Sequence, residues 1–340
     1  MLLFYPGGSL EETLVETDVE VVHLGKRGRR ELLRFVIRLV RAIRKRRPQI
    51  VYGFLPTPNL LLALTRPFHR CRLAFGLFGA ARGPEPRVSA RIERRLEPVL
   101  ARLADVVIVK SAAGRDDALA RGFPVRKVHV VPNGVDGSDL RFDPEARTAV
   151  RQSYGVAGPL IGIVARLDPI KDHETFLAAF GLVLKAQPSA LALVVGTDPG
   201  GRAADLRAAA AAGGLADRVI ILGPVTDVGA IYSACDVVVI SSRSEAGPAV
   251  LLEALACGTA CASTDVGHAR SILGDDQLVA PVADPVGLAA AIQVALSLGS
   301  DDVARGARRT KVLQDYGAGC MVTQTMTALG LEPWPAHSIR

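Results

Sequence analysis

The chain has 340 residues, 49% of them hydrophobic and 22% charged, which is enough for about two domains with separate cores. No apolar run reaches the roughly 20 residues that span a bilayer, the first residues lack the basic region of a signal peptide, and the five cysteines show no metal-ligand spacing. We therefore expect a cytoplasmic protein with reduced cysteines. Residues 1–150 hold 27 Lys and Arg against 16 Asp and Glu, whereas residues 151–340 hold 14 against 18, so the first half supplies the positive charge.

Short apolar runs separated by helical segments recur along the whole chain, which predicts parallel, doubly wound α/β sheets. The predicted strands are residues 19–24, 50–54, 73–77, 106–109 and 128–131 in the first half, and 160–164, 190–195, 219–222, 237–240 and 260–263 in the second. A polar stretch at 136–146 precedes a helix near Arg147 and a Gly/Pro break at 155–159. We place the linker there, between a domain of residues 1–146 and one of 147–325, with a tail of 326–340.

The segment between Arg27 and Arg47 predicts a helix with one basic face. Its cations are Arg30, Arg34, Arg38, Arg41 and Lys45, opposite Leu33, Val36, Ile37, Val40 and Ile43. Such a face is either simply solvated or attracted to anionic lipid headgroups, which would hold the protein peripherally on the inner face of the membrane. Nucleic acid is a poorer partner, because no aromatic residues interleave with the arginines.

Two glutamates, Glu245 and Glu253, bracket a predicted helix start directly after an apolar strand. Gly247 allows a turn and Pro248 suits the first helical position, so the amides that follow can bind an anion. The helix rises only about 7 to 8 Å from Pro248 to Glu253, so one ligand with an anionic middle and hydroxylated ends could reach the amides and both carboxylates. The alternative is an ordinary solvated helix start.

Two cations, Arg166 and Lys171, follow another predicted strand about 80 residues earlier. Ligands of open α/β sheets bind at the carboxyl ends of the strands, and paired Arg and Lys can hold a diphosphate without a metal. A salt bridge from Lys171 to Asp168 or Asp172 is the structural alternative.

These segments resemble glycosyltransferase family 4, the retaining transferases of GT-B fold, over about residues 20 to 325. The similar motifs are Val164-Ala-Arg-Leu-Asp-Pro-Ile-Lys-Asp172, the spacing of Glu245 and Glu253, Glu253-Ala-Leu-Ala-Cys-Gly258 with Thr264-Asp-Val-Gly267, and Val131-Pro-Asn-Gly-Val-Asp136. The resemblance implies two Rossmann-like domains facing a cleft. It also implies donor binding by Arg166, Lys171, Val225, Glu245, Gly247, Pro248, Ala249, Val250 and Glu253, with Ala246-Gly247-Pro248 where the family usually has Gly-Phe-Pro.

The resemblance further implies a role for each site residue in sugar transfer. Arg166 and Lys171 would hold the donor diphosphate and stabilise the charge on the leaving group, and Glu253 would hold the ribose hydroxyls. Glu245 would contact the transferred sugar as a positioning and electrostatic residue. No metal or other cofactor is needed on this view. The partners are a nucleotide-sugar donor and a lipid-linked or saccharide acceptor, in cell-surface polysaccharide or glycolipid synthesis.

The beginning of the chain departs from the family pattern. Members usually open with a strand, a Gly-rich loop and a helix, whereas Met1-Leu-Leu-Phe-Tyr-Pro-Gly-Gly8 is similar to the strand after that unit. We therefore expect a truncated amino-terminal domain or a start that lies upstream. Phe78 falls where relatives often carry a polar side chain, and Tyr52 and Arg82 are the acceptor-side candidates.

Two other functions need weighing. A nicotinamide-dependent oxidoreductase needs Gly-x-Gly-x-x-Gly after a strand, and the glycines from Gly196 to Gly201 do not fit that spacing. A non-catalytic or inactive nucleotide-sugar-binding protein stays open, because the donor half is intact while the acceptor half looks truncated.

Overall fold

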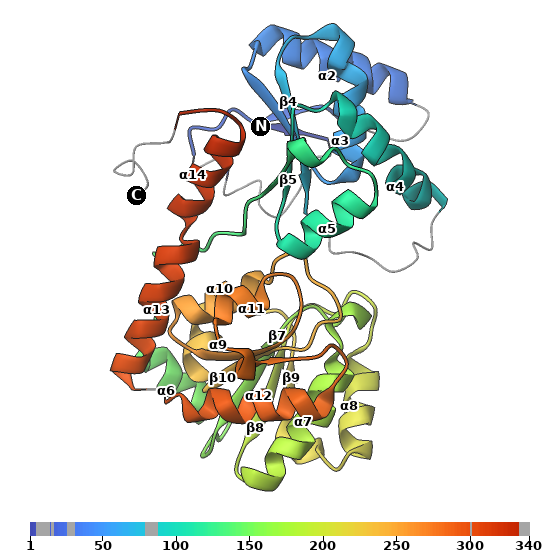
Figure 1. Cartoon of the computed structure of the whole chain (residues 1–340). Helices are drawn as coiled ribbons and strands as arrows, with labels where there is room; N and C mark the ends of the chain where they lie inside the picture. Colours follow the sequence, from blue (N-terminus) through green and yellow to red (C-terminus); the bar gives the residue numbers. More distant parts are fainter. Residues whose placement is uncertain (5–13, 15–16, 26–30, 79–87, 300, 333–340) are drawn as a thin grey trace. The chain divides into compact units, whose positions relative to one another are not determined.

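The computed structural model describes the chain except residues 5–13, 15–16, 26–30, 79–87, 300 and 333–340 (Figure 1). Its contacts divide it into two compact units, which we treat separately. The amino-terminal unit consists mainly of residues 1–78, 84–108 and 118–129, and the carboxy-terminal unit mainly of 109–117 and 130–340. The second unit thus begins before the polar stretch where we placed the linker, and it includes the last described helix, α14 (Ala318–Ala328).

The carboxy-terminal unit is built on a six-stranded parallel sheet with the strand order β12-β11-β10-β7-β8-β9. The strands are β7 (Leu160–Val164), β8 (Leu191–Val195), β9 (Val219–Leu222), β10 (Val237–Ile240), β11 (Ala260–Thr264) and β12 (Val279–Ala280). Five of them confirm the predicted runs to within one residue. Two-residue β12 was not predicted, because so short a run has no periodicity to detect.

Helices cover both faces of this sheet (Figure 1). One face packs on α7 (His173–Ala186), α8 (Ala203–Ala212) and α12 (Pro285–Ser297), and the other on α9 (Val228–Ala234), α10 (Ala249–Ala256), α11 (Ala269–Leu273) and α13 (Asp302–Tyr316). Strand β10 is therefore buried on both of its faces. Val237 and Val239 join the first core cluster while Val238 and Ile240 join the second, so every residue of the strand is apolar.

The amino-terminal unit contains two parallel sheets. Strands β1 (Leu2–Leu3) and β2 (Val22–His23) form one, and β3 (Ile50–Phe54), β4 (Arg72–Leu77), β5 (Val106–Val109) and β6 (Val128–Val130) form the other in that order. Its described helices are α2 (Leu32–Arg46), α3 (Pro56–Thr65) and α4 (Val88–Leu100), and α5 (Ala112–Ala120) is divided between the two units. The α/β class with parallel sheets predicted from the sequence is therefore confirmed, and the carboxy-terminal sheet winds in two directions as predicted.

The predicted basic helix forms as α2, but its buried face is rotated from the expected one and shares only Ile43 with it. Its buried residues are Phe35, Leu39, Ala42 and Ile43. The side chains of Leu33 and Ile37, which we placed opposite the cations, are 76% and 41% exposed. The predicted helix start near Arg27 and Arg30 lies outside the described residues.

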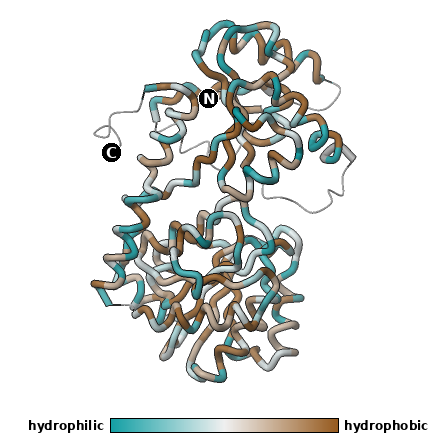
Figure 2. Tube along the Cα trace, viewed as in Figure 1, coloured by the Kyte–Doolittle hydropathy of each residue, from teal (hydrophilic) through white to brown (hydrophobic). Residues whose placement is uncertain are grey.

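Figure 2 shows hydrophobic and hydrophilic stretches along the trace of both units. Within the described chain, no single helix combines the length and the apolar character needed to cross a membrane. The bent pair α12 and α13 meets that test jointly, on length and composition only.

Candidate active site

The topology of the carboxy-terminal unit places two loops side by side. From β7 the chain winds through β8 to β9 in one direction, and from β10 through β11 to β12 in the other. Neighbouring strands β7 and β10 therefore form the point where the winding direction reverses. The loops that follow β7 and β10 lead to helices on opposite faces of the sheet. In open α/β sheets, ligands bind in the crevice between two such loops, at the carboxyl ends of the strands.

The loop after β7 is held tightly against the end of β8. The Ala165 N–H donates to the Val195 carbonyl and the Leu167 N–H to the Thr197 carbonyl, each at 2.9 Å. Gly196 makes this approach possible, because a Cβ there would stand 2.0 Å from the Ala165 carbonyl oxygen. Arg166 projects from this anchored loop with 58% of its side chain exposed.

Lys171 ends a short 3₁₀ turn, Pro169–Lys171, that begins with Asp168 as its cap. Its ammonium group lies 2.5 Å from Oε1 of Glu245 in the loop after β10. The hydroxyl of Ser242 donates to the same Glu245 oxygen at 2.7 Å, and the hydroxyl of Ser241 donates to the Lys171 carbonyl at 2.7 Å. The two loops are therefore joined by the charged pair and by the Ser241 hydrogen bond, while Ser242 orients Glu245 within its own loop.

The two cations of the β7 loop form different ion pairs. Lys171 pairs with Glu245, whereas Arg166 lies 3.3 Å from Asp168. Asp172 is buried in the left-handed conformation, with φ of 50°, and caps α7 by accepting from the Thr175 N–H at 3.4 Å, while the Thr175 hydroxyl donates to it at 2.9 Å. Its second partner is Arg243, whose Nε lies 2.9 Å away. Asp172 thus fixes where the β7 loop becomes α7.

The second loop leads into α10, which begins at Ala249. Pro248 is the cap residue, with φ of −73° and ψ of 93°, and not the first helical residue as we expected. The difference is one residue, because the fixed φ of proline suits both the cap and the first helical position. The first-turn amides of Ala249 and Val250 still belong to the helix start.

Close packing shapes the backbone in front of α10. A Cβ on Gly267 would lie 3.2 Å from both the Glu245 carbonyl oxygen and Pro248 Cδ. The amide of Asn133 donates to the Gly247 carbonyl at 3.0 Å. Asn133 and Gly267 both belong to motifs that carried the family resemblance, and in the structure both contact the segment just before α10.

Glu253 lies one turn further along α10 and has a partner that sequence reasoning missed. The hydroxyl of Tyr232, a fully buried residue of α9, donates to Glu253 Oε2 at 2.6 Å. Burial raises the pKa of Tyr232, and the neighbouring carboxylate raises it further, so the hydroxyl stays protonated and can only donate to Glu253. Val225, the remaining predicted donor residue, follows β9 and packs half-buried against the core.

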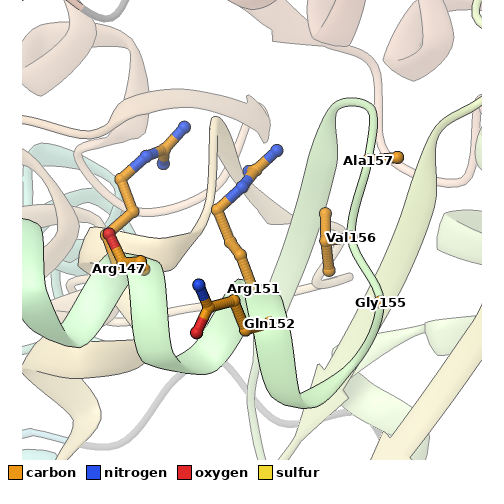
Figure 3. A pocket seen from close by; sticks show the side chains of 7 residues that line it. Arg147, Arg151, Gln152, Gly155, Val156 and Ala157 are labelled. Atoms are coloured by element: carbon orange, nitrogen blue, oxygen red, sulfur yellow. The ribbon is translucent and has the colours of Figure 1, made fainter.

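An open hollow of about 420 Å³ lies elsewhere, along α6 (Pro144–Ser153), and is lined by Arg147 and Arg151. Both guanidinium groups leave α6 on the same side (Figure 3). They bind the two oxygens of Asp236 at 2.6 and 2.9 Å and carbonyls at the end of α9. These arginines therefore fasten α6 to the sheet.

The acceptor-side candidates give a mixed result. The rings of Tyr52, Phe54 and Phe78 form a cluster at the carboxyl ends of β3 and β4, with centroid separations of 4.4 to 6.1 Å. Burial raises the pKa of Tyr52. Arg82 lies outside the described residues. Among the described side chains, no three of His, Cys, Asp and Glu gather as a metal ion would require.

Two family models match the chain. Residues 2–138 match the model described as "Glycosyltransferase Family 4", and residues 158–297 match "Glycosyl transferases group 1". Two curated relatives are named D-inositol 3-phosphate glycosyltransferase. The one from Geodermatophilus obscurus is 33% identical over 66% of this chain and 52% of its own length, and the one from Kineococcus radiotolerans is 30% identical over 72% and 61%. The chain thus spans less than two thirds of these relatives.

Solved structures show the same fold at low sequence identity. HepE of Anabaena, crystallised with UDP and glucose, superposes with a TM-score of 0.81 at 22% identity, over 97% of this chain and 90% of that one. A glycosyltransferase from Rickettsia africae superposes with a TM-score of 0.80 at 18% identity, over 96% and 90%. These likenesses show that the chain has the GT-B fold. The two family models, which together match 277 of the 340 residues, show that it belongs to glycosyltransferase family 4.

Proposed function

We propose that this protein transfers a sugar from a nucleotide-sugar donor to an acceptor. The observation that carries the proposal is the meeting of Lys171 and Glu245 at the point where the winding of the carboxy-terminal sheet reverses, with Arg166 on the same loop as Lys171. This arrangement supplies two cations for a diphosphate beside one carboxylate for a sugar. The Anabaena neighbour solved with UDP and glucose supports this class of donor.

Donor binding would change the partners of charged side chains that are already in the site. Among the described residues, exposed Arg166 pairs with Asp168 at 3.3 Å, and such a pair contributes at most about 1 kcal/mol, so a diphosphate can recruit its guanidinium at low cost. Lys171 would exchange part of its contact with Glu245 for a phosphate oxygen. Glu245 would then face the sugar hydroxyls while Ser242 keeps its carboxylate oriented.

Cleavage of the bond between the sugar and the diphosphate leaves negative charge on the leaving phosphate and positive charge on the sugar ring. Arg166, Lys171 and the amides at the start of α10 would stabilise the first charge, and Glu245 the second. These fixed cations support a reaction that requires no divalent metal. Glu253, oriented by the Tyr232 hydroxyl, would hold the ribose. We propose retention of configuration at the transferred sugar, on the strength of the family.

The acceptor we propose is lipid-linked or a saccharide with an apolar face, used in cell-surface polysaccharide or glycolipid synthesis at the cytoplasmic side of the membrane. The supporting observation is the aromatic cluster at the carboxyl ends of β3 and β4, where Phe54 and Leu55 are 50% and 51% exposed. An acceptor such as D-inositol 3-phosphate, for which the curated relatives are named, would need cations instead.

The test is a turnover assay on the full chain with several nucleotide-sugars and three acceptor classes: a lipid-linked saccharide, a free saccharide and D-inositol 3-phosphate. We expect release of nucleoside diphosphate that depends on the donor and on an apolar acceptor, and a product whose anomeric configuration, read by NMR, equals that of the donor. Donor binding without release on any acceptor would make the chain a nucleotide-sugar-binding protein. Failure to bind any donor would overturn both functions.

A further inference from the structure

Helix α4 of the amino-terminal unit carries a row of apolar side chains that no part of the described chain covers. Ile92, Leu96 and Val99 are 52%, 46% and 55% exposed, and Leu103 in the turn after the helix continues the row at 44%. At 3.6 residues per turn, the three helical positions fall within roughly 60° of the circumference. Hydrophobic and hydrophilic residues alternate along this helix (Figure 2).

Arginines line one side of that row. Arg91, Arg94 and Arg95 are exposed and fall within the roughly 100° of circumference between the apolar row and the buried face. The two acidic residues of α4 turn inward. Glu93 accepts from the Thr57 hydroxyl of α3, and buried Glu97 pairs with Arg121 at 2.8 Å. The outward surface of α4 is therefore apolar and cationic.

Helix α2 repeats this arrangement. Leu33 and Ile37 are exposed, and the basic row of Arg34, Arg41 and Lys45 lies next to them. Helix α3 packs between α2 and α4, and its sequence contains no charged residue. Leu64 of α3 and Phe68 just after it are 49% and 53% exposed. We refer to the solvent side of α2, α3 and α4 as the α2–α4 face.

Exposed apolar residues are concentrated in the unit that contains this face. Of the large hydrophobic residues that are exposed in the described chain, fourteen precede residue 130 and only four follow it, namely Val282, Val286, Leu298 and Val303. A soluble surface scatters such residues evenly, whereas a concentration of them marks an interaction site. This uneven distribution therefore favours an interaction surface on the amino-terminal unit.

We propose that the α2–α4 face docks on an anionic lipid bilayer, with the apolar row of α4 buried at the boundary between headgroups and acyl chains. The rows of arginine and lysine beside the apolar residues would bind the lipid phosphates. A second copy of the chain fits this face poorly. A symmetric dimer would set the cationic rows against each other, and the buried centres of protein interfaces are depleted of charge.

The test measures co-flotation of the full chain with vesicles of phosphatidylcholine alone and with added phosphatidylglycerol, at low and high salt. We expect binding only to the anionic vesicles, weakened by salt. The α4 variant Ile92→Ser, Leu96→Ser, Val99→Ser should bind at least tenfold more weakly at either salt concentration. The α2 variant Arg34→Gln, Arg41→Gln, Lys45→Gln should lose roughly a hundredfold at low salt and little at high salt.

The control is Val286→Ser with Val303→Ser, two apolar residues of the other unit that are more exposed than the α4 row, at 68% and 84%, and it should leave flotation unchanged. Equal flotation of the α4 variant and the parent chain would overturn the proposal. So would a parent chain that ignores anionic vesicles, or one that sedimentation shows to be a dimer separated into monomers by the α4 substitutions. Vesicle binding needs no donor, so UDP titration of the same variants reports separately on the proposed transfer function.

Discussion

Lys171 and Glu245 form an ion pair across the two loops at the centre of the carboxy-terminal sheet, with 2.5 Å between Nζ and Oε1, although 74 residues separate them in the chain. The side chains are only 21% and 15% exposed. Because an ion pair sheltered from water is stronger than a surface pair, each residue holds the other in place before a ligand arrives. The pair unites two motifs that the sequence presents as separate candidates.

The first prediction concerns Arg166. Arg166→Ala removes a charge-assisted contact to the donor diphosphate, which contributes about 1.5 to 3 kcal/mol, so UDP should bind roughly tenfold to a hundredfold more weakly. Isothermal titration calorimetry measures the change. Arg207→Ala, on the exposed side of α8, is the matched control and should bind like the parent chain. Equal affinity of the Arg166 variant would remove this residue from the site.

The second prediction separates the two glutamates. Glu253→Gln should raise KM more than it lowers kcat, because the ribose contact is the same in the ground and transition states. Tyr232→Phe, which deletes only the hydroxyl that orients Glu253, should act in the same direction and more weakly.

Glu245→Gln should instead lower kcat, since its carboxylate opposes the charge that develops on the sugar ring. The same substitution releases Lys171, so UDP without a sugar should bind as tightly as before or more tightly. Steady-state kinetics and UDP titration together decide the matter. A Glu245→Gln protein with unchanged kcat and weakened UDP binding would reverse the assigned roles.

The third prediction concerns metals. If Arg166 and Lys171 carry the charge of the diphosphate, transfer measured with excess chelator should proceed near its normal rate. The control is the same reaction with added magnesium or manganese. Loss of activity on chelation, followed by recovery with either ion, would refute the proposed electrostatics.

The fourth prediction concerns pH. His173, the first residue of α7, is 3% exposed, and burial lowers its pKa from 6.5 to about 4. The unfolded chain therefore takes up a proton below pH 6.5 that the folded chain refuses until about pH 4, so stability is full above pH 6.5 and falls as the pH drops through that window. Between pH 7 and pH 5 the loss should be about 2 kcal/mol.

Denaturant unfolding at the two pH values measures this loss. The His173→Gln variant has no titrating group at this position. Its loss of stability between pH 7 and pH 5 should therefore be about 2 kcal/mol smaller than that of the parent chain. The comparison subtracts the contributions of His69 and His268, whose pKa values are also lowered by burial. Identical pH dependence in the two proteins would show that His173 is not the responsible group.

The sequence alone predicted the α/β class, most strands of the carboxy-terminal sheet and the proposed donor-site residues, but not Tyr232. Strands such as β7 and β10 are buried on both faces, so they appear as unbroken apolar runs with clear limits. The start of α10 was predicted to within one residue, because proline beside glycine restricts the backbone locally. Signals of this kind depend only on neighbouring residues.

Only the tertiary structure decided which of these residues meet. Whether Lys171 pairs with Asp168, Asp172 or Glu245 depends on β7 lying beside β10, and strand order is not written in any local pattern. Tyr232 reaches Glu253 because α9 packs against α10, which no local pattern specifies either. The sequence of α2 allows two apolar faces. Packing buries the face with Phe35 and Leu39 and leaves Leu33 and Ile37 exposed. Periodicity shows that a helix has an apolar side, whereas the neighbouring elements determine which residues are buried.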